Sequence, residues 1–310
     1  MIRRSGFLSA ASAAACALAL PSRAFGADSL KIATLPIDAA MTPFYAQQME
    51  FYSKAGIAAE ISTFTNGGAS AQAMISGAAD IGLVDTVSMA SAHSRGVPIA
   101  FIAPGAVFTK AGQAYWLIVP SASPLQKAKD FAGKTIAVNG IKNITQVPTE
   151  GWLDANGGDA KAAKFIEMPF PAMVAALEKG TIDAAVVTEP TIALTAGKVR
   201  VISIFDNGIG VFQVNGYAAT TDWIAKNKAL AKRFATATID ANKWANAHPA
   251  ETAKIISSVS KLAPEVLGQM SRAQYADKLD LAVIQSMIDA SVRYGVIPKS
   301  FPARDVVATL

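Results

Sequence analysis

Two stretches of the chain, AMISGAADIGLVDT at residues 73–86 and ALEKGTIDAAVVTE at residues 176–189, share one pattern. Each begins as a helical segment that ends at a glycine, Gly77 or Gly180. Glycine at that position is typical of a helix end, because it adopts the left-handed backbone conformation at little cost. The two copies lie about a hundred residues apart, so they predict two lobes built on the same plan.

A short apolar strand follows the glycine in both copies, at 81–84 and 184–187, and each strand stops at a polar pair, Asp85-Thr86 or Thr188-Glu189. In open α/β sheets, ligands bind at the carboxyl ends of the strands. The repeat therefore places polar side chains where a ligand would meet each lobe.

Residues 1–26 have the features of a secretory signal peptide. Arg3-Arg4 precedes an uncharged, Ala-rich run over 7–20, and Ala24-Phe25-Gly26 supplies small residues before a cut ahead of residue 27. The run of about 14 residues is shorter than the ~20 that span a bilayer. Export by the general secretory route is favoured over the twin-arginine route, which stays open. Lipid attachment at Cys16 is not expected.

Charge and cysteine content exclude several classes of function. The formal net charge of +5 falls to +2 once Arg3, Arg4 and Arg23 leave with the first 26 residues, so no nucleic-acid surface is indicated. The one cysteine also leaves with this segment, which removes disulfides and thiolate metal sites from the mature chain. His93 and His248 lie far apart in the sequence and predict neither a metal site nor a catalytic pair.

Alternating strand and helix patterns predict an α/β protein of two lobes joined by two crossovers. The first lobe comprises residues 27–115 together with 206–310, and the second comprises residues 116–205. From residue 221 onward the pattern is helical, and we expect these helices to cover the first lobe.

The turns between strands and helices carry the candidate site. The Asn66–Ser70 loop has glycines that let a ligand approach the backbone, and its free amides favour an anion. The Asn139–Thr145 loop is its counterpart in the second lobe. Each candidate also has a structural interpretation: Ser70 and Asp85 as helix caps, Lys142 as a solvated charge, and Glu189 as an offset to a helix dipole.

The chain resembles the periplasmic substrate-binding proteins of ABC importers, in the SsuA/THI5-like and NMT1-like branch that includes aliphatic-sulfonate, taurine, nitrate and thiamine-pyrimidine binders. The segments that carry the resemblance are PFYAQ at 43–47, FYSKAGI at 51–57, SGAADIG at 76–82, FAGKTIAV at 131–138, LEKGTIDAA at 177–185 and Glu189-Pro190. The resemblance rests on the order and spacing of these segments, and it covers essentially the whole of the chain after residue 26.

This resemblance implies an α/β protein with the type II periplasmic binding protein fold, in which two Rossmann-like lobes are joined by two hinge strands. It implies a monomer that binds a small molecule and delivers it to an ABC permease in the inner membrane, driven by a cytoplasmic ATPase. The family's ligand loops correspond by position to Asp38, Thr42, Asn66, Gly67, Gly68, Ser70, Asp85, Thr86, Asn139, Ile141, Asn143, Thr145 and Glu189.

No cofactor and no enzymatic activity are expected. The chain has no GxSxG elbow, HExxH motif or phosphate loop with lysine. The fungal pyrimidine-synthase relatives carry a cysteine-rich motif, which the chain lacks. A ligand-sensing module and an enzyme of that branch are the alternative functions.

The ligand stays open at this point, and a small organic acid or heterocycle is the favoured expectation. Helix starts with Ser70, Asn143 and Thr145 suit a carboxylate or sulfonate, whereas Asp38, Asp85 and Glu189 suit an amine or a ring with donors. Four aromatic residues either stack on a ligand or belong to the core: Tyr45, Phe108, Tyr115 and Phe212.

Overall fold

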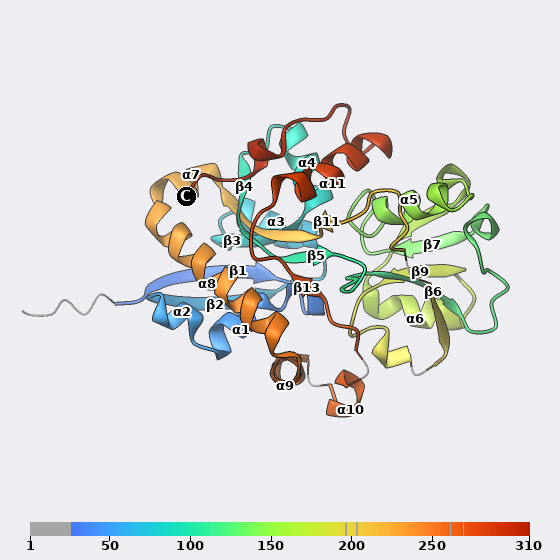
Figure 1. Cartoon of the computed structure of the whole chain (residues 1–310), viewed down its shortest axis with the longest axis horizontal. Coiled ribbons are helices and arrows are strands. Elements are labelled where there is room, and N and C mark those ends of the chain that lie inside the picture. The colour runs from blue at the N-terminus through green and yellow to red at the C-terminus, as the bar shows by residue number, and fades with distance from the viewer. Residues whose placement is uncertain (1–25, 196, 203, 261, 269) are drawn as a thin grey trace, which may run out of the picture.

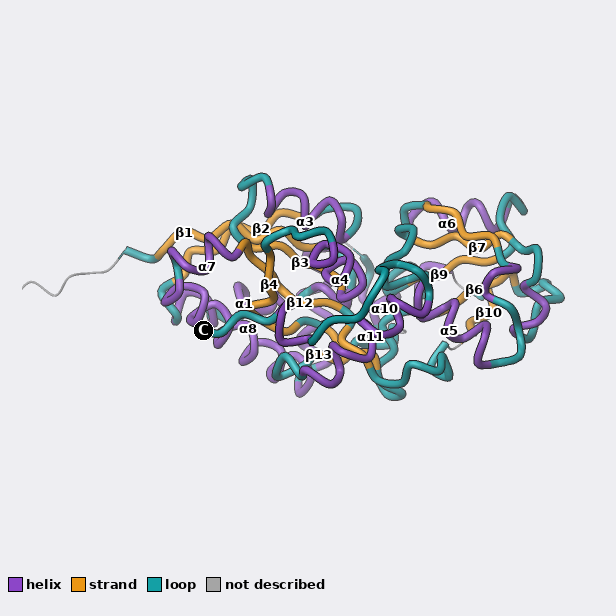
Figure 2. Tube along the Cα trace, turned by 90° about the horizontal axis from the view of Figure 1, so that it is seen from above, coloured by secondary structure: helices purple, strands orange, loops and turns teal. Residues whose placement is uncertain are grey.

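The computed structural model describes residues 26–195, 197–202, 204–260, 262–268 and 270–310. Two five-stranded sheets lie side by side along the long axis of the molecule (Figures 1 and 2). Nearly all of the predicted signal peptide lies outside the described residues. Among the residues described, no helix combines the length and apolar character that crossing a membrane requires.

The first sheet has the order β2-β1-β3-β12-β4. Its strands are β1 (Asp28–Thr34), β2 (Ile57–Thr63), β3 (Ile81–Asp85), β4 (Ile99–Pro104) and β12 (Asn215–Thr220). β1 pairs in parallel with β2 and β3, whereas β12 runs antiparallel between β3 and β4. The sheet thus receives one strand from far along the chain.

The second sheet repeats this order as β8-β7-β9-β6-β10. Its strands are β6 (Trp116–Pro120), β7 (Thr135–Val138), β8 (Lys164–Glu167), β9 (Ala184–Val187) and β10 (Val199–Ile202). β7 pairs in parallel with β8 and β9, and β6 runs antiparallel between β9 and β10. The strand after the repeated glycine, β3 or β9, therefore occupies the third position of both sheets.

The repeated stretch also makes the same backbone contacts in both copies. The Asp80 carboxylate accepts the Lys31 amide at 2.8 Å, and the Asp183 carboxylate accepts the Thr135 amide at 2.8 Å. Each aspartate comes directly before a strand, β3 or β9, and its carboxylate bonds to the backbone of the neighbouring strand, β1 or β7. The repeated glycines, at φ +78° and +68°, adopt the predicted left-handed conformation.

The chain passes between the sheets twice, from β5 (Ala106–Phe108) to β6 and from β10 to β11 (Phe212–Gln213). A small third sheet, β11-β5-β13, lies near these crossovers and includes β13 (Gln274–Tyr275). No pattern in the sequence predicts this sheet.

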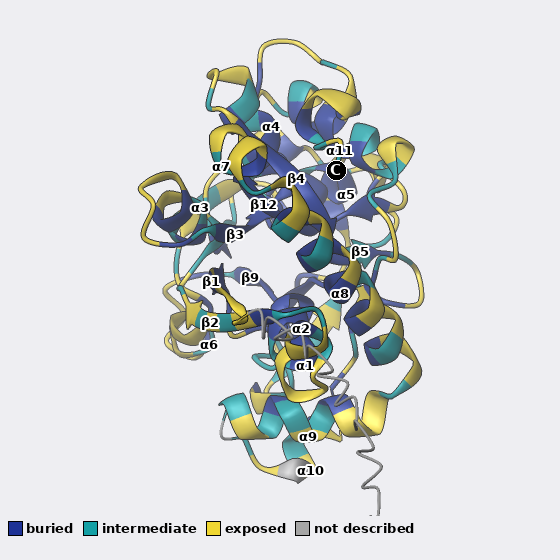
Figure 3. Cartoon of the chain, turned by 90° about the vertical axis from the view of Figure 1, so that its left-hand side faces the viewer, coloured by how far each residue is buried: buried dark blue, intermediate teal, exposed yellow. Residues whose placement is uncertain are grey.

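Helices cover the faces of both large sheets, and the central strands are buried, whereas the edge strands β2, β8 and β10 are largely exposed or half-buried (Figure 3). In the first half the helices are α1 (Thr42–Gln48), α2 (Phe51–Lys54), α3 (Gly67–Ile75), α4 (Thr86–Ser94), α5 (Val147–Ala155) and α6 (Phe170–Glu178). The helical tail contains α7 (Thr221–Lys226), α8 (Lys228–Ala247), α9 (Pro249–Ser260), α10 (Pro264–Leu267) and α11 (Leu281–Arg293). Short 3-10 helices lie at Asp38–Ala40, Ala128–Phe131, Ala160–Ala162, Ala193–Thr195 and Ala303–Val306.

The tail covers the first sheet as predicted, with α8 against α1, α2 and β4, and α11 against α4. Two expected helices differ from the structure. The sequence over 44–55 has the spacing of one helix, but the structure breaks it at Glu50, whose backbone is left-handed at φ +62°. A helix expected to begin at Glu189 is absent from the described residues there, which form turns and the 3-10 helix Ala193–Thr195.

A candidate ligand-binding cavity between the two sheets

Strand ends and loops from both sheets enclose a small cavity. Its lining residues are Leu35, Ile37, Gly67, Leu83, Asp85, Tyr115, Asn139, Asn143, Ile144, Phe170 and Asn215. The volume is about 20 Å³, which is room for roughly one water molecule. A solute enters only if the two sheets move apart or the lining side chains shift.

Asp85 is the charged residue of this cavity. It lies at the end of β3 and is 6% exposed, and its Oδ1 caps α4 by accepting the Ser88 amide at 2.9 Å. Its Oδ2 lies so close to Gly67 that a Cβ there would be 3.2 Å away. A side chain at position 67 would therefore crowd this oxygen. Both the cap and the cavity interpretations of Asp85 apply at once.

Burial raises the pKa of Asp85, and the Ser88 hydroxyl, and after it the backbone N–H groups of Ser88, Ile144 and Val87, act against this shift. Ile144 belongs to the loop after β7, so a group of the second sheet already faces this carboxylate. The pKa of Tyr115 is raised as well, by burial first and by the charge of Asp85 second. Tyr115 therefore stays a neutral phenol at physiological pH.

The second sheet contributes an amide pair from the Asn139–Thr145 loop. Asn143 donates from Nδ2 to Asn139 Oδ1 at 2.9 Å, and its own Oδ1 accepts both the amide and the hydroxyl of Thr145. These bonds hold the loop's two asparagines in the cavity wall. Gly67 of the Asn66–Ser70 loop lines the same cavity.

The structure places only four of the predicted site residues in the cavity wall: Gly67, Asp85, Asn139 and Asn143. Four others are buried hydroxyls with partners inside the fold: Thr42 on Asn242, Ser70 on the Ala33 carbonyl, Thr86 on the Gln213 carbonyl, and Thr145 on Asn143. Asn66, and not Ser70, is the cap of α3, accepting the Ala69 amide at 2.9 Å.

Gly68 and Ile141 line a wide groove outside the cavity. This groove has a volume of about 700 Å³, lies between α3 and α4, and reaches Lys142 of the second sheet's loop. Lys142 donates from Nζ to the Gly295 carbonyl at 2.8 Å, so it has a defined partner. The groove borders the same two loops from their outer side.

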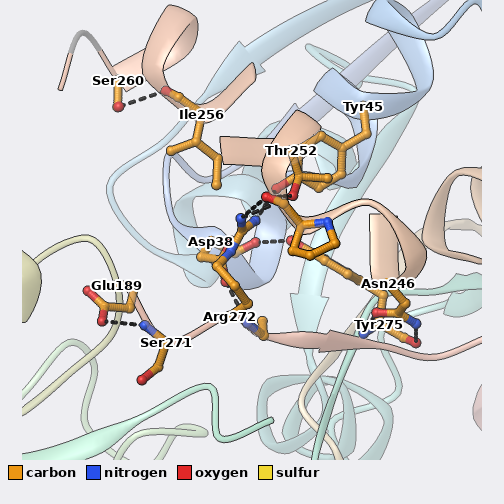
Figure 4. A network of polar contacts seen from close by, with 12 residues as sticks. Asp38, Tyr45, Glu189, Asn246, Thr252, Ile256, Ser260, Ser271, Arg272 and Tyr275 are labelled. Carbon is orange, nitrogen blue, oxygen red and sulfur yellow. Dashed lines mark hydrogen bonds and ion pairs between the residues drawn. The ribbon is translucent and has the colours of Figure 1, made fainter. Parts of the chain in front are cut away.

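Asp38 and Glu189 belong to a separate polar network (Figure 4). Asp38 is 2% exposed, and its Oδ1 accepts Nη2 and Nε of Arg272 at 2.8 and 3.1 Å. Its Oδ2 accepts the Ala273 amide at 2.6 Å. Burial raises the pKa of Asp38, and Arg272 counteracts the shift.

Arg272 is shared among several groups of this network. It also donates to the Tyr45 hydroxyl at 3.0 Å and to Thr252 Oγ1 at 3.0 Å. Tyr45, one of the four aromatic candidates, is fully buried, and its ring packs against the Tyr275 ring in a T-shaped arrangement. Its core interpretation is the one that the structure supports.

Glu189 joins the two halves of this network. Its Oε1 accepts the Ser271 amide and its Oε2 accepts the Ala193 amide, both at 3.1 Å, while its carbonyl accepts the Asp38 amide at 3.1 Å. The segment 271–273 therefore contacts Asp38, which follows β1, and Glu189, which follows β9. Burial raises the pKa of Glu189. Ligand contact by Asp38 and Glu189 stays a prediction, because neither lines the cavity as it stands.

Sequence reasoning missed Asn215 and Phe170 as cavity residues. Asn215 is paired with Asp85 in the β3–β12 register and is 2% exposed. Its Nδ2 donates to the Ala39 carbonyl and its Oδ1 accepts the Ala106 amide. An asparagine in a central strand is the signal that was available, since a buried amide needs partners.

Metal ligands and cavity polar groups define the chemistry open to the residues that the structure describes. In those residues no three His, Cys, Asp or Glu side chains lie where they could hold a metal ion. The cavity offers one carboxylate, neutral amides and apolar surface. Such a set binds a solute by hydrogen bonds and packing.

Known proteins similar to this chain share this architecture. The family model described as NMT1/THI5 like matches residues 39–252. The taurine-binding periplasmic protein of Escherichia coli strain K12 is 29% identical over 215 residues, which are 69% of this chain. The chain spans 65% of the length of that curated relative.

Two solved structures agree with the fold. The periplasmic aliphatic sulphonate-binding protein SsuA from Escherichia coli superposes with a TM-score of 0.74 at 16% identity, over 90% of this chain and 97% of that one. The ligand-binding component of an ABC-type import system from Staphylococcus aureus gives 0.79 at 17% identity, over 91% and 96%. The fold is the type II periplasmic binding protein fold, as predicted.

Proposed function

The chain belongs to the NMT1/THI5-like family, and from this premise we propose that it is the extracytoplasmic solute-binding component of an ABC import system. It captures a small organic acid or heterocycle in the cavity between its lobes and delivers it to a permease in the inner membrane. The observation that carries the proposal is the cavity itself, because both sheets contribute strand-end residues to it.

We propose the lobe division that the sequence predicts, residues 27–115 with 206–310 as one lobe and residues 116–205 as the other. The two crossovers between the sheets support this division. Domain closure about such crossovers is a common way to enclose a ligand. The cavity has room for about one water molecule, so this conformation corresponds to a closed or nearly closed state.

Solute binding is tested by a thermal-shift and calorimetry screen of sulfonates, carboxylates, amines, pyrimidines and nitrate. A ligand at 100 times its Kd stabilises the folded protein by about 2.7 kcal/mol. Turnover of a compound without any saturable binding signal would overturn the proposal in favour of an enzyme. Asn143→Trp should abolish binding, because it fills the cavity.

Closure is tested with two cysteines, since residues 27–310 contain none. Ile75 and Ile141 are 42% and 45% exposed and line the same groove from opposite sheets. Spin labels at Ile75→Cys and Ile141→Cys should report a ligand-dependent change in distance. The control pair Met49→Cys and Ile75→Cys lies within the first lobe and should report none.

Periplasmic location is also part of the proposal. The protein recovered from the periplasm should have a mass that corresponds to cleavage before Ala27. Deleting the gene in its source organism should abolish uptake of the ligand at low concentration, and uptake that continues unchanged would argue against the transport role.

A further inference from the structure

The charge pattern of the cavity limits the chemical class of the ligand. This inference rests on the proposed solute-binding function and specifies what the cavity accepts. Asp85 is 6% exposed, and it is the one acidic side chain among the cavity-wall residues that the structure describes. None of the described residues that line this cavity is Lys, Arg or His.

The Asp85 carboxylate faces neutral groups. The Ser88 hydroxyl, and after it the backbone N–H groups of Ser88, Ile144 and Val87, oppose the shift that burial imposes on the pKa of Asp85. Tyr115 is the other titratable group of the wall, and its own pKa is raised. A buried carboxylate without a cation is costly, and a ligand that brings a positive charge or N–H donors relieves that cost.

An anionic group at the same place would meet like charge in a desolvated cavity. The amides of Asn139 and Asn143 supply N–H donors for the polar remainder of a ligand, whereas the Asn215 amide is already bonded to the Ala39 carbonyl and the Ala106 amide. Leu35, Leu83, Ile37 and Phe170 supply apolar surface around them.

We propose that the ligand of this cavity presents a nitrogen-bound hydrogen to the Asp85 carboxylate, as a protonated amine, an amidine or an amino-substituted heterocycle does. A zwitterion fits if its cationic end lies at Asp85 and its anionic end lies at the amides. A simple anion without such a donor does not fit.

The experiment uses matched probes that differ in the nitrogen group. Taurine is compared with isethionate, benzylamine with benzyl alcohol, and 4-aminopyrimidine with pyrimidine, while nitrate and ethanesulfonate serve as anions without a donor. Calorimetry on the full protein should show the nitrogen-bearing member of at least one pair binding about 10- to 100-fold tighter, as expected for a hydrogen bond to a charged group.

Asp85→Asn removes the charge and keeps a residue that caps α4 well, so the fold should be retained. This variant should lose the preference for the nitrogen-bearing probe. The control Asp280→Asn makes the same change at the cap of α11, outside the cavity, and should retain the preference. Circular dichroism of both variants checks the fold.

The sign of the pH dependence gives an independent readout. Binding to the ionised carboxylate releases a proton, so affinity for the nitrogen-bearing probe should fall as the pH falls through the pKa of Asp85. Binding of an anion next to the protonated carboxyl group would instead become stronger as the pH falls.

The outcomes separate the two proposals. If donor-free anions bind as tightly as the nitrogen-bearing probes, or if Asp85→Asn keeps the preference, the Asp85 inference is overturned while solute binding stands. If no probe of either kind binds, the solute-binding proposal fails and the inference fails with it.

Discussion

Replacing Arg272 by methionine tests whether the network around Asp38 holds the two halves of the protein together. Asp38 is 2% exposed and accepts three N–H groups, two from Arg272 and one from Ala273. Arg272→Met keeps a long apolar stem but leaves the buried carboxylate with the Ala273 amide alone. Breaking a buried pair in this way costs about 3–5 kcal/mol of the free energy of unfolding.

The loss should depend on pH, and its sign follows from the pKa of Asp38. Burial already raises this pKa, and removing the cation raises it further. A raised carboxyl pKa means that the folded state holds its proton to higher pH than the unfolded chain, so stability is lost as the pH rises. The difference between Arg272→Met and the unmutated protein should therefore be larger at pH 8 than at pH 5.

Urea unfolding at both pH values, followed by tryptophan fluorescence, measures this loss. Arg233→Met is the matched control, because its ion pair with Asp28 is 39% and 54% exposed and should contribute less than about 1 kcal/mol. Asp38→Asn added to Arg272→Met should restore part of the stability by removing the stranded charge. The reasoning is refuted if Arg272→Met costs no more than the control, or if the second change only adds to the loss.

Two further predictions concern the pH dependence of α5 and the repeated glycines. Burial raises the pKa of Glu150 to about 7 from an ordinary 4.5, so the free energy of unfolding should decrease as the pH rises from about 4.5 to 7. Glu150→Gln should therefore make the free energy of unfolding depend less on pH between pH 5 and 8. An unchanged pH profile would contradict this. Gly77→Ala and Gly180→Ala should each lower the free energy of unfolding in urea by roughly 1–2 kcal/mol, because both glycines have positive φ. An added Cβ would have no neighbour within 4 Å, so this backbone strain is the whole expected cost. A silent change at one of the two would show that the copies are not equivalent.

Local patterns were sufficient to predict most of the fold. Buried apolar runs predicted the parallel strands, and the glycines at 77 and 180 predicted the helix ends before β3 and β9. The position of β12 between β3 and β4 was not predictable, because a strand's neighbours depend on contacts between residues far apart in sequence. The break at Glu50 was missed because its left-handed backbone has no glycine to signal it.

The candidate site was predicted in outline and not in detail. Position after a strand selected Asp85 and Asn143, and both line one cavity. The same rule also selected Ser70 and Thr86, whose hydroxyls have backbone partners inside the fold. Sequence alone does not tell which way a polar side chain at a strand end points, and the partner of Asp38, Arg272, lies 234 residues away.

The placement of β12 affects the order in which the protein can fold. Every strand of the second sheet lies within residues 116–202, whereas the first sheet is incomplete until residues 215–220 arrive between β3 and β4. During synthesis from the N-terminus, β3 thus keeps an unpaired edge while the entire second sheet is being made, and such edges favour aggregation. We expect the later-synthesised sheet to mature first. Pulse-labelled hydrogen exchange during refolding should show β9 amides protected before those of β3, and the reverse order would contradict this expectation.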